Sequence, residues 1–178
     1  WIWIILGYLA GSVPFALLIG LAHGTDIRRQ GSGNVGATNC GRVLGKKWFF
    51  ICFTLDVLKG ALPVLGAGWA MGVLGDLSID AATQWQWLAV AAAAPVGHVF
   101  PIWLKFKGGK GVATGFGVLL GFFPFLTVCA IAALLVFGAV LAVSRYVGLA
   151  SSVAAVSLPV LVAAMGGWAD RSIGQITP

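Results

Sequence analysis

Long apolar segments alternate with short polar ones along the whole chain. The apolar segments cover residues 1–22, 48–71, 85–104, 112–123, 125–143 and 152–168. An α-helix needs roughly 20 apolar residues to cross the ~30 Å hydrocarbon core of a bilayer, so most of these segments are long enough to span a membrane. The pattern predicts an all-α, polytopic membrane bundle that forms a single domain over residues 1–178.

Two of the apolar stretches contain helix breakers. The first is interrupted halfway by Gly11-Ser12-Val13-Pro14, and a proline inside a membrane helix frees a backbone carbonyl and bends the helix. Residues 112–144 carry no charge and would form one helix of ~50 Å, well over the bilayer thickness. We therefore expect a break near Pro124 and two shorter helices. Residues 1–22 lack the basic start and cleavage site of a signal peptide, so they are expected to form the first helix.

Composition and charge agree with a membrane protein. The chain is 60% hydrophobic and its mean hydropathy is +0.99, which excludes an ordinary soluble domain. The net charge of +6 would suggest nucleic acid in a soluble protein, but eight of the eleven Lys and Arg residues fall in loops 23–47 and 105–111. Under the positive-inside rule these loops, with 144–151, face the cytoplasm. The expected partner is a lipid bilayer and not nucleic acid, and the three cysteines imply no disulfide framework.

The second apolar segment contains two charged residues. Asp56 and Lys59 are spaced i, i+3, so they lie on one helical face and can form an ion pair. A charge inside a membrane helix marks a functional site by default, whereas a neutralised pair can serve helix packing alone. Both interpretations stay open.

The first polar loop is rich in small and hydrogen-bonding residues. It contains the run Gly31-Ser32-Gly33-Asn34-Val35-Gly36-Ala37-Thr38-Asn39, and the second loop contains Lys107-Gly108-Gly109-Lys110-Gly111. Glycine permits the φ > 0 conformations that turn successive N–H groups toward an anion. The formal G-x-G-x-x-G match has no preceding strand, and the second loop lacks Walker spacing, so we predict phosphate binding without a nucleotide fold.

The sequence contains no recognisable nucleophile–base set. The five acidic residues are dispersed, and His98 has no second His or Cys at ligand spacing, so no metal or cofactor is expected. Any catalysis would have to come from positioning and electrostatic stabilisation. That favours a reactive substrate which brings its own leaving group.

Three groups of motifs carry a family resemblance that extends from about Gly11 to Ser152. They are Gly11-Ser12-Val13-Pro14 with the run 31–39; Gly97-His98-Val99-Phe100-Pro101 with Phe106-Lys107-Gly108-Gly109-Lys110-Gly111-Val112-Ala113-Thr114; and Arg145-Tyr146-Val147. The chain resembles the bacterial acylphosphate:glycerol-3-phosphate acyltransferases, the PlsY family.

The resemblance implies a seven-helix enzyme of the bacterial inner membrane whose active site opens to the cytoplasm. Such an enzyme transfers a fatty acyl group from acyl phosphate to the 1-hydroxyl of glycerol 3-phosphate, giving lysophosphatidic acid and phosphate in phospholipid synthesis. Acyl phosphate is an activated mixed anhydride, which agrees with the missing protein nucleophile. We expect it to need no cofactor and to function as a monomer.

The resemblance also implies the site residues. The catalytic set would be Ser32, Asn34, His98 and Lys107. The substrate and phosphate-binding set would be Gly31, Gly33, Gly36, Thr38, Asn39, Arg42, Gly108, Gly109, Lys110, Arg145 and Ser151. Where the family usually has a serine after Arg-Tyr-Val this chain has Gly148, so Ser151 is expected to substitute for it.

The family's last helix and its Asn-Ile motif have no counterpart before Pro178, so we expect a truncated chain or an impaired enzyme. A transporter or binding protein for a phosphorylated solute or lipid is the alternative function. It would use the same loops without breaking a bond, and Asp56 and Lys59 would then mark the pathway.

Overall fold

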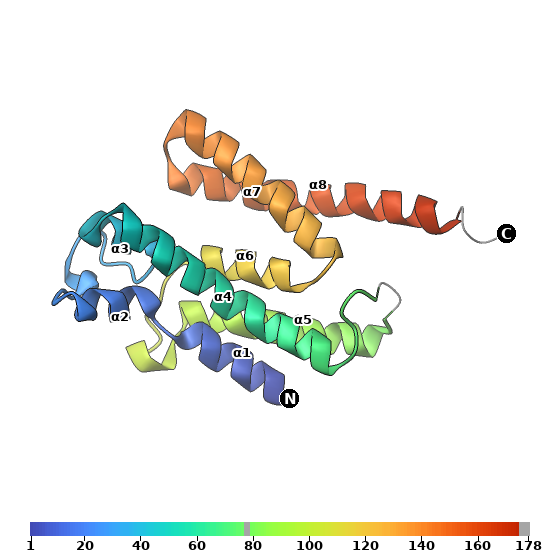
Figure 1. Cartoon of the computed structure of the whole chain (residues 1–178), viewed down its shortest axis with the longest axis horizontal. Helices are drawn as coiled ribbons and strands as arrows, with labels where there is room; N and C mark the ends of the chain where they lie inside the picture. Colours follow the sequence, from blue (N-terminus) through green and yellow to red (C-terminus); the bar gives the residue numbers. More distant parts are fainter. Residues whose placement is uncertain (77–78, 175–178) are drawn as a thin grey trace. The chain divides into compact units, whose positions relative to one another are not determined.

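The described part of the chain folds into helices and connecting loops, with no strand. A computed structural model describes residues 1–76 and 79–174, with side chains up to residue 166 outside that gap (Figure 1). The helices are α1 (Ile2–Ser12), α2 (Phe15–Ala22), η1 (Ile27–Arg29), α3 (Ala37–Leu44), α4 (Lys46–Ala70), α5 (Ala81–Val99), η2 (Ile102–Leu104), α6 (Val112–Gly121), α7 (Phe125–Ser144) and α8 (Val147–Gly174). They form two compact units, Trp1–Gly121 and Phe122–Pro178.

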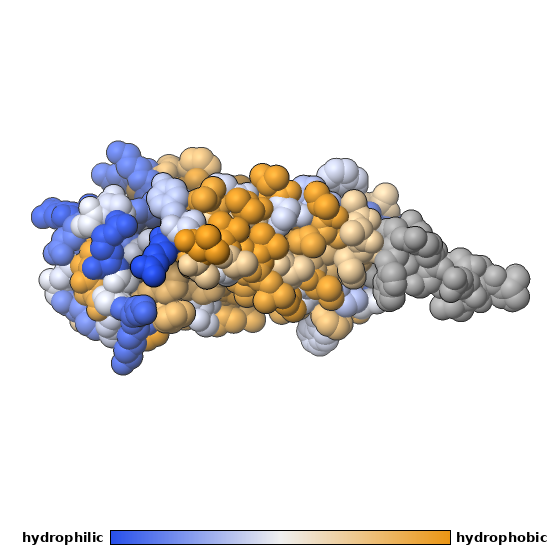
Figure 2. Space-filling model, turned by 90° about the horizontal axis from the view of Figure 1, so that it is seen from above, coloured by the Kyte–Doolittle hydropathy of each residue, from blue (hydrophilic) through white to orange (hydrophobic). Residues whose placement is uncertain are grey.

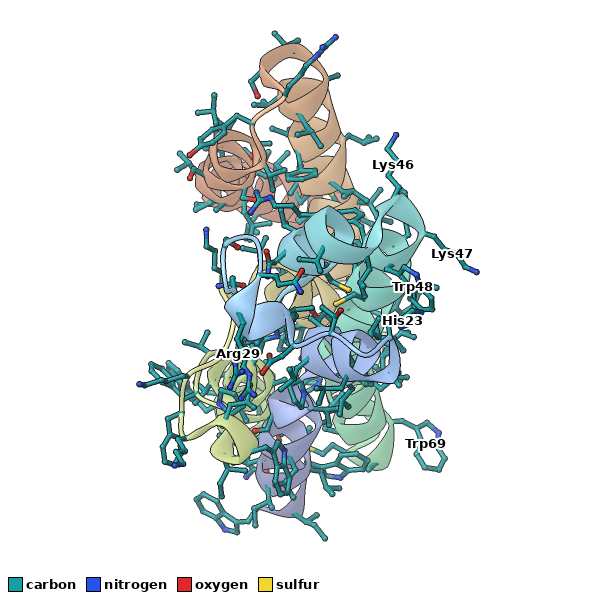
Figure 3. The ribbon with its side chains drawn as sticks, turned by 90° about the vertical axis from the view of Figure 1, so that its left-hand side faces the viewer. His23, Arg29, Lys46, Lys47, Trp48 and Trp69 are labelled. Carbon is teal, nitrogen blue, oxygen red and sulfur yellow. The ribbon has the colours of Figure 1, made fainter. Side chains whose placement is uncertain are left out.

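The predicted all-α membrane architecture is confirmed. The described residues include five segments long and apolar enough to cross a membrane, and α6 is a shorter apolar helix. The five are Ile2–Ala22, Lys46–Ala70, Ala81–Leu104, Phe125–Ser144 and Val147–Gly166. Hydrophobic residues cover much of the face shown in Figure 2, and hydrophilic residues gather at one end. Figure 3 shows the molecule from this end, and Lys46 and Lys47 project away from the ribbon there.

Both expected helix breaks are present. α1 ends at Ser12 and α2 begins at Phe15, so the first span is divided at Val13-Pro14. α6 ends at Gly121 and α7 begins at Phe125 after Pro124. In both cases a proline, which has no N–H to continue the helical ladder, stands at the interruption.

Several helix ends differ from the sequence-based ranges, and local contacts explain two of them. α5 begins at Ala81 rather than residue 85 because the Asp80 carboxylate accepts hydrogen bonds from the N–H groups of Ala82 and Thr83, at 2.9 and 3.1 Å. The junction expected over 144–151 is only two residues long. Arg145 adopts a left-handed conformation that ends α7, and α8 begins at Val147. Residues 77–78, in the connection between α4 and α5, and residues 175–178, at the C-terminal end, lie outside the described residues.

The first loop contains a helix that the hydrophobic pattern missed. α3 is short and amphipathic, and its residues Ala37 and Cys40 are buried with Ile27, Val35 and Leu17 in one apolar cluster. Because the cluster joins α2, the loop and α3, it attaches the polar 31–36 segment to the membrane helices.

Glycines let the helices of the first unit approach one another closely. α1 lies against α5, and α4 lies against α6 (Figure 1). A β-carbon on Gly11 would collide with the Ala94 carbonyl, and one on Gly60 would collide with the Thr114 carbonyl. Small residues at such crossings are the usual device of membrane helix packing. These crossings bring the C-terminal end of α5 and the N-terminal end of α6 beside the middle of α4.

The Gly11 crossing can be tested by adding one methyl group. We expect Gly11→Ala to lower the free energy of unfolding in detergent by about 1–3 kcal/mol, because the added β-carbon has no space beside Ala94. The matched control is Gly115→Ala on α6, where a β-carbon would meet no atom within 4 Å, and we expect it to be neutral or stabilising by up to ~1 kcal/mol. Equal losses for the two variants would contradict the packing argument.

Candidate active site

The two polar loops of the first unit meet at one pocket. It has a volume of about 360 Å³ and is lined by Arg28, Ser32, Gly33, Asn34, Val35, Lys107 and Gly108. Loop 31–36 supplies hydroxyl, amide and backbone groups, and loop 105–111 supplies a lysine. The structure therefore brings together Ser32, Asn34 and Lys107, which lie far apart in the sequence.

The first loop turns sharply at its glycines. Gly31 and Gly33 have φ values of +60° and +71°, in the left-handed region that side chains disfavour. A β-carbon on Gly31 would also collide with Asn39 Oδ1. These positions explain why the segment requires glycine, and the turn exposes Ser32 on its outer side.

Asn39 braces this turn from within. Its side chain is 1% exposed. Its Oδ1 accepts a hydrogen bond from the Ser32 N–H at 2.8 Å, and its Nδ2 donates to the carbonyls of Ile27 and Gln30 at 2.9 and 3.1 Å. Both amide N–H groups are thus engaged inside the protein. Asn39 is placed to hold the loop in shape.

The remaining predicted residues of this segment lie around α3. Gly36 is the residue before the helix, and its carbonyl accepts from the N–H groups of Asn39 and Cys40, both at 3.1 Å. Thr38 and Arg42 are exposed on α3 and are not among the residues that line the pocket.

The second loop folds back onto the end of α5. The Gly108 N–H donates to the Val99 carbonyl at 3.0 Å, and the Gly109 N–H donates to the His98 carbonyl at 3.1 Å. A β-carbon on Gly108 would collide with the His98 carbonyl, so the chain needs glycine here to come this close. Lys107 and Lys110 remain exposed, and of the two only Lys107 lines the pocket.

His98 lies behind the second loop and not in the pocket lining. Its side chain is buried, its Nδ1 is 3.1 Å from the Thr114 hydroxyl oxygen, and a β-carbon on Gly109 would collide with its Nε2. The ring also lies level with Asp56, which is ten residues beyond Lys46, the start of α4. That is ~15 Å along the helix, so the second loop is recessed below the beginning of α4.

Arg28 is a pocket residue that the sequence analysis did not include. Its guanidinium forms an ion pair with Asp26, with 2.7 Å between Nη2 and Oδ2, and Asp26 also accepts from the Arg28 N–H at 3.0 Å. This hydrogen-bonded guanidinium lowers the pKa of the Asp26 carboxyl to about 2. The signal available in the sequence was Asp26 itself, which stands two residues before Arg28 as the cap of η1. The pair orients one positive charge at the pocket.

Arg145 and Ser151 belong to the second unit, where they lie at the end of α7 and in α8. Arg145 is exposed and Ser151 is partly exposed. Their assignment to the site therefore stays a prediction.

The pocket can bind a phosphorylated molecule. Two cationic side chains, of which Arg28 is ion-paired with Asp26, converge on it with a hydroxyl, a side-chain amide and a glycine-rich backbone, the groups that recognise phosphate oxygens. Among the described residues no group of three or more His, Cys, Asp and Glu side chains is placed to hold a metal ion. The groups that line the pocket can position a phosphorylated substrate and stabilise a developing negative charge.

The comparisons with known proteins all match one family. Residues 1–176 match the family model described as glycerol-3-phosphate acyltransferase. A glycerol-3-phosphate acyltransferase of Trichlorobacter lovleyi is 44% identical over 160 residues, covering 90% of this chain and 76% of the relative. The glycerol-3-phosphate acyltransferase of Myxococcus xanthus is 50% identical over 149 residues, which cover 83% of this chain and 71% of that relative.

A solved structure is similar over most of the chain. The crystal structure of PlsY (YgiH), an integral membrane glycerol 3-phosphate acyltransferase, in its glycerol 3-phosphate form superposes with a TM-score of 0.81 at 38% sequence identity. The match covers 93% of this chain and 76% of that one.

The brace at Asn39 predicts a loss of stability and of local order. Asn39→Ala removes three hydrogen bonds, including the one that the Ser32 N–H donates to Oδ1, so we expect the free energy of unfolding to fall by about 2–3 kcal/mol. Amide hydrogen exchange at Ser32 should accelerate. Thr38→Ala, an exposed neighbour on α3, should change stability by less than about 0.5 kcal/mol. Slow exchange at Ser32 in Asn39→Ala would contradict the brace.

The Asp26–Arg28 pair predicts a specific pH window. Because the folded-state pKa of Asp26 is lowered to about 2, its contribution to stability is complete above the unfolded value of about 3.9 and is lost as the pH falls through about 2. The difference in unfolding midpoint between the wild type and Asp26→Asn should stay constant from about pH 7 to 5 and shrink below about pH 4. A difference that varies between about pH 5 and 7 would show that another group titrates with the pair.

Proposed function

The chain belongs to the glycerol-3-phosphate acyltransferase family, and from this premise we propose that the pocket binds acyl phosphate and glycerol 3-phosphate together. The protein is an integral membrane enzyme that acylates glycerol 3-phosphate in phospholipid synthesis. We propose, beyond this activity, that acyl phosphate is the acyl donor, which residues contact the substrates, and on which side of the membrane the pocket lies.

The observation that supports the proposal is the meeting of the two loops at one pocket. Ser32 and Asn34 come from the first loop, and Lys107 comes from the second. The pocket combines uncharged donors with Lys107 and Arg28, so it can hold a phosphate and also stabilise a developing negative charge on an acyl oxygen. We assign contact with the substrates to these four side chains and to the backbone of Gly33 and Gly108.

The proposed reaction is a direct acyl transfer between the two substrates. The 1-hydroxyl oxygen of glycerol 3-phosphate attacks the carbonyl carbon of acyl phosphate and forms a new ester bond. The bond between that carbon and the phosphate oxygen breaks, and its electron pair leaves with the phosphate. The hydroxyl proton passes to the departing phosphate, so no protein base is needed. Lys107 stabilises the charge that develops, because a preformed donor is most effective where charge appears in the transition state.

The remaining predicted residues take supporting roles. Gly31, Gly36 and Asn39 shape the first loop, and His98 and Gly109 shape the second. Thr38, Arg42 and Lys110 are exposed near the loops and are proposed to attract the phosphorylated substrates. Arg145 and Ser151 are proposed to complete the site.

We place the pocket on the cytoplasmic side of a bacterial inner membrane, with the enzyme acting as a monomer. Basic residues dominate the loops at this end, as the positive-inside rule requires of cytoplasmic loops. The His98 ring, on which the second loop rests, lies beside Asp56, ~15 Å along α4 from its start, so we propose that the acyl chain of the substrate lies among the apolar helices near the pocket. That depth suits a lipid-soluble donor with a phosphorylated head.

Kinetics of two alanine variants test the assignment. In purified protein, Lys107→Ala should lower kcat/KM by ~10²-fold or more, because a charge-stabilising donor is lost. Ser32→Ala should lower it by ~10-fold, the effect of one lost hydrogen bond to a charged group. The measurement is release of phosphate from acyl phosphate, dependent on glycerol 3-phosphate.

The matched control is Lys47→Ala, which removes a positive charge at the same end of the molecule but outside the pocket. It should keep wild-type turnover. Full turnover in Lys107→Ala would refute the site assignment, and equal use of acyl-CoA as donor would refute the proposed acyl phosphate specificity.

A further inference from the structure

A buried ion pair occupies the middle of α4, outside the pocket. Lys59 Nζ lies 2.7 Å from Asp56 Oδ1, and the two side chains are 4% and 2% exposed. Asp56 Oδ2 also accepts a weak hydrogen bond from the Cys52 thiol at 3.7 Å. Charges at this depth of a membrane helix are unfavourable even when paired, so the pair calls for a reason beyond the filling of space.

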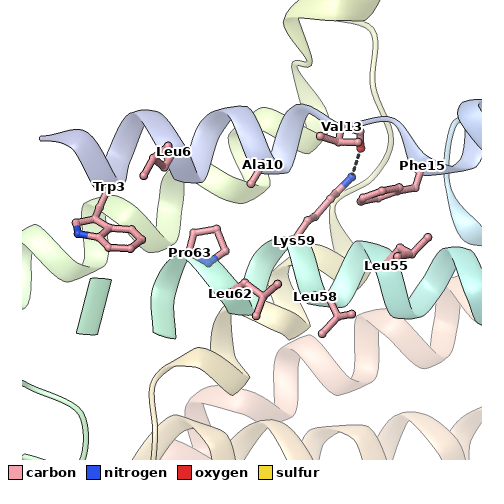
Figure 4. A pocket seen from close by; sticks show the side chains of 10 residues that line it. All are labelled: Trp3, Leu6, Ala10, Val13, Phe15, Leu55, Leu58, Lys59, Leu62 and Pro63. Atoms are coloured by element: carbon pink, nitrogen blue, oxygen red, sulfur yellow. Dashed lines mark hydrogen bonds between the residues drawn. The ribbon is translucent and has the colours of Figure 1, made fainter. Parts of the chain in front are cut away.

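Lys59 reaches the break between α1 and α2. Its Nζ donates to the Val13 carbonyl at 2.8 Å and lies 5.6 Å from the centre of the Phe15 ring. Figure 4 shows the lysine extending from α4 to this carbonyl. Pro14 interrupts the helical ladder here, and a carbonyl released inside a bilayer must find a donor in the protein. The Val13 carbonyl accepts from the Phe15 N–H at 3.1 Å, and Lys59 provides a second donor to the same oxygen.

Asp56 faces His98 on the other side. Asp56 Oδ1 lies 3.8 Å from His98 Nδ1 and, apart from the ion pair, has no hydrogen-bond partner among the described residues. The Thr114 hydroxyl oxygen is 3.1 Å from the same ring nitrogen. A carboxylate on this side favours the tautomer with its proton on Nδ1, which then donates to Thr114. The unprotonated Nε2 faces Gly109.

This arrangement connects the ion pair to the pocket. The His98 ring lies against Gly109, and the His98 carbonyl accepts the Gly109 N–H. Gly108, the next residue, lines the pocket beside Lys107. A rotated or shifted His98 ring would remove the surface on which this turn rests. Displacements of about 1 Å in a supporting contact are enough to lower turnover substantially.

We propose that Asp56 and Lys59 are positioning residues of the acyltransferase site: their ion pair holds the His98 ring with Nδ1 toward Asp56 and Nε2 against Gly109, and so fixes the Gly108–Gly109 turn. The proposal rests on the proposed function of the pocket. It predicts that loss of the Asp56 carboxylate lowers kcat/KM for the phosphorylated substrates, and that this loss of activity is not explained by the change in stability.

A double variant separates the two effects. Asp56→Asn alone leaves Lys59 charged and buried, so it should lower both the thermal stability and the turnover. Asp56→Asn combined with Lys59→Met removes both charges, and we expect its unfolding temperature to rise above that of Asp56→Asn, although the Val13 carbonyl loses one of its two donors. Its kcat/KM for glycerol 3-phosphate should nevertheless stay at least ~10-fold below wild type, because His98 is no longer oriented. Thr54→Val, on the exposed side of α4, is the control that should match the wild type.

A second variant keeps the ion pair intact. Thr114→Val removes only the hydroxyl beside His98 Nδ1, and it should lower kcat/KM without lowering the unfolding temperature by more than a few degrees. Recovery of both turnover and stability in the double variant would overturn the proposal. So would unchanged kinetics in Asp56→Asn and Thr114→Val.

The histidine tautomer gives a readout that does not depend on any of these variants. The chain has two histidines, so the background variant His23→Gln leaves His98 as the only imidazole signal. Nitrogen-15 NMR should show a proton on Nδ1 and none on Nε2, and the opposite tautomer would overturn the proposal. Failure of the proposed function would look different, because the wild type would then release no phosphate dependent on glycerol 3-phosphate.

Discussion

The fold depends on the rule that backbone polar groups in a bilayer must be satisfied inside the protein. The first span is interrupted at Val13-Pro14, between α1 and α2. The Val13 carbonyl there accepts from the Phe15 N–H at 3.1 Å and from Lys59 Nζ at 2.8 Å, and Asp56 neutralises the lysine. The break in the first span thereby meets the two charges that are buried in α4.

Glycine crossings extend the consequences of this arrangement to the loops. Because Gly11 and Gly60 have no β-carbon, α5 comes close to α1 and α6 comes close to α4. His98 at the end of α5 then lies beside Asp56, and Thr114 at the start of α6 lies beside His98. The loop between α5 and α6 is therefore held against the end of α5, and the pocket forms between it and the first loop.

The two loops are held by different means, and both leave their polar groups available. The first is braced by the amide of Asn39 and attached by the apolar residues Ile27 and Val35. The second rests on the last turn of α5 through the backbone of Gly108 and Gly109. Neither brace uses the side chains of Ser32, Asn34 or Lys107, so these polar groups stay available to a substrate. Loops that are held in shape before a substrate arrives are preorganised, as the proposed reaction without a protein nucleophile requires.

Much of this architecture could be predicted from local features of the sequence. The lengths of the apolar segments, the breaks at Pro14 and Pro124 and the two glycine loops follow from residue type and spacing alone. α3 was missed because it is too short and too polar for a hydropathy pattern. The start of α5 was misplaced because the cap formed by Asp80 is a polar signal that hydropathy ignores.

By itself, therefore, the sequence determined the membrane class, the helix interruptions and the two loops with a preference for phosphate, since all of these depend on neighbouring residues. Only the tertiary structure decided which side chains of those loops meet. Asn39 turns inward, His98 lies behind Gly109, and Arg28 joins the pocket. These outcomes depend on how closely separate helices approach and on which buried polar atoms find partners, and neither property is encoded at any single position in the chain.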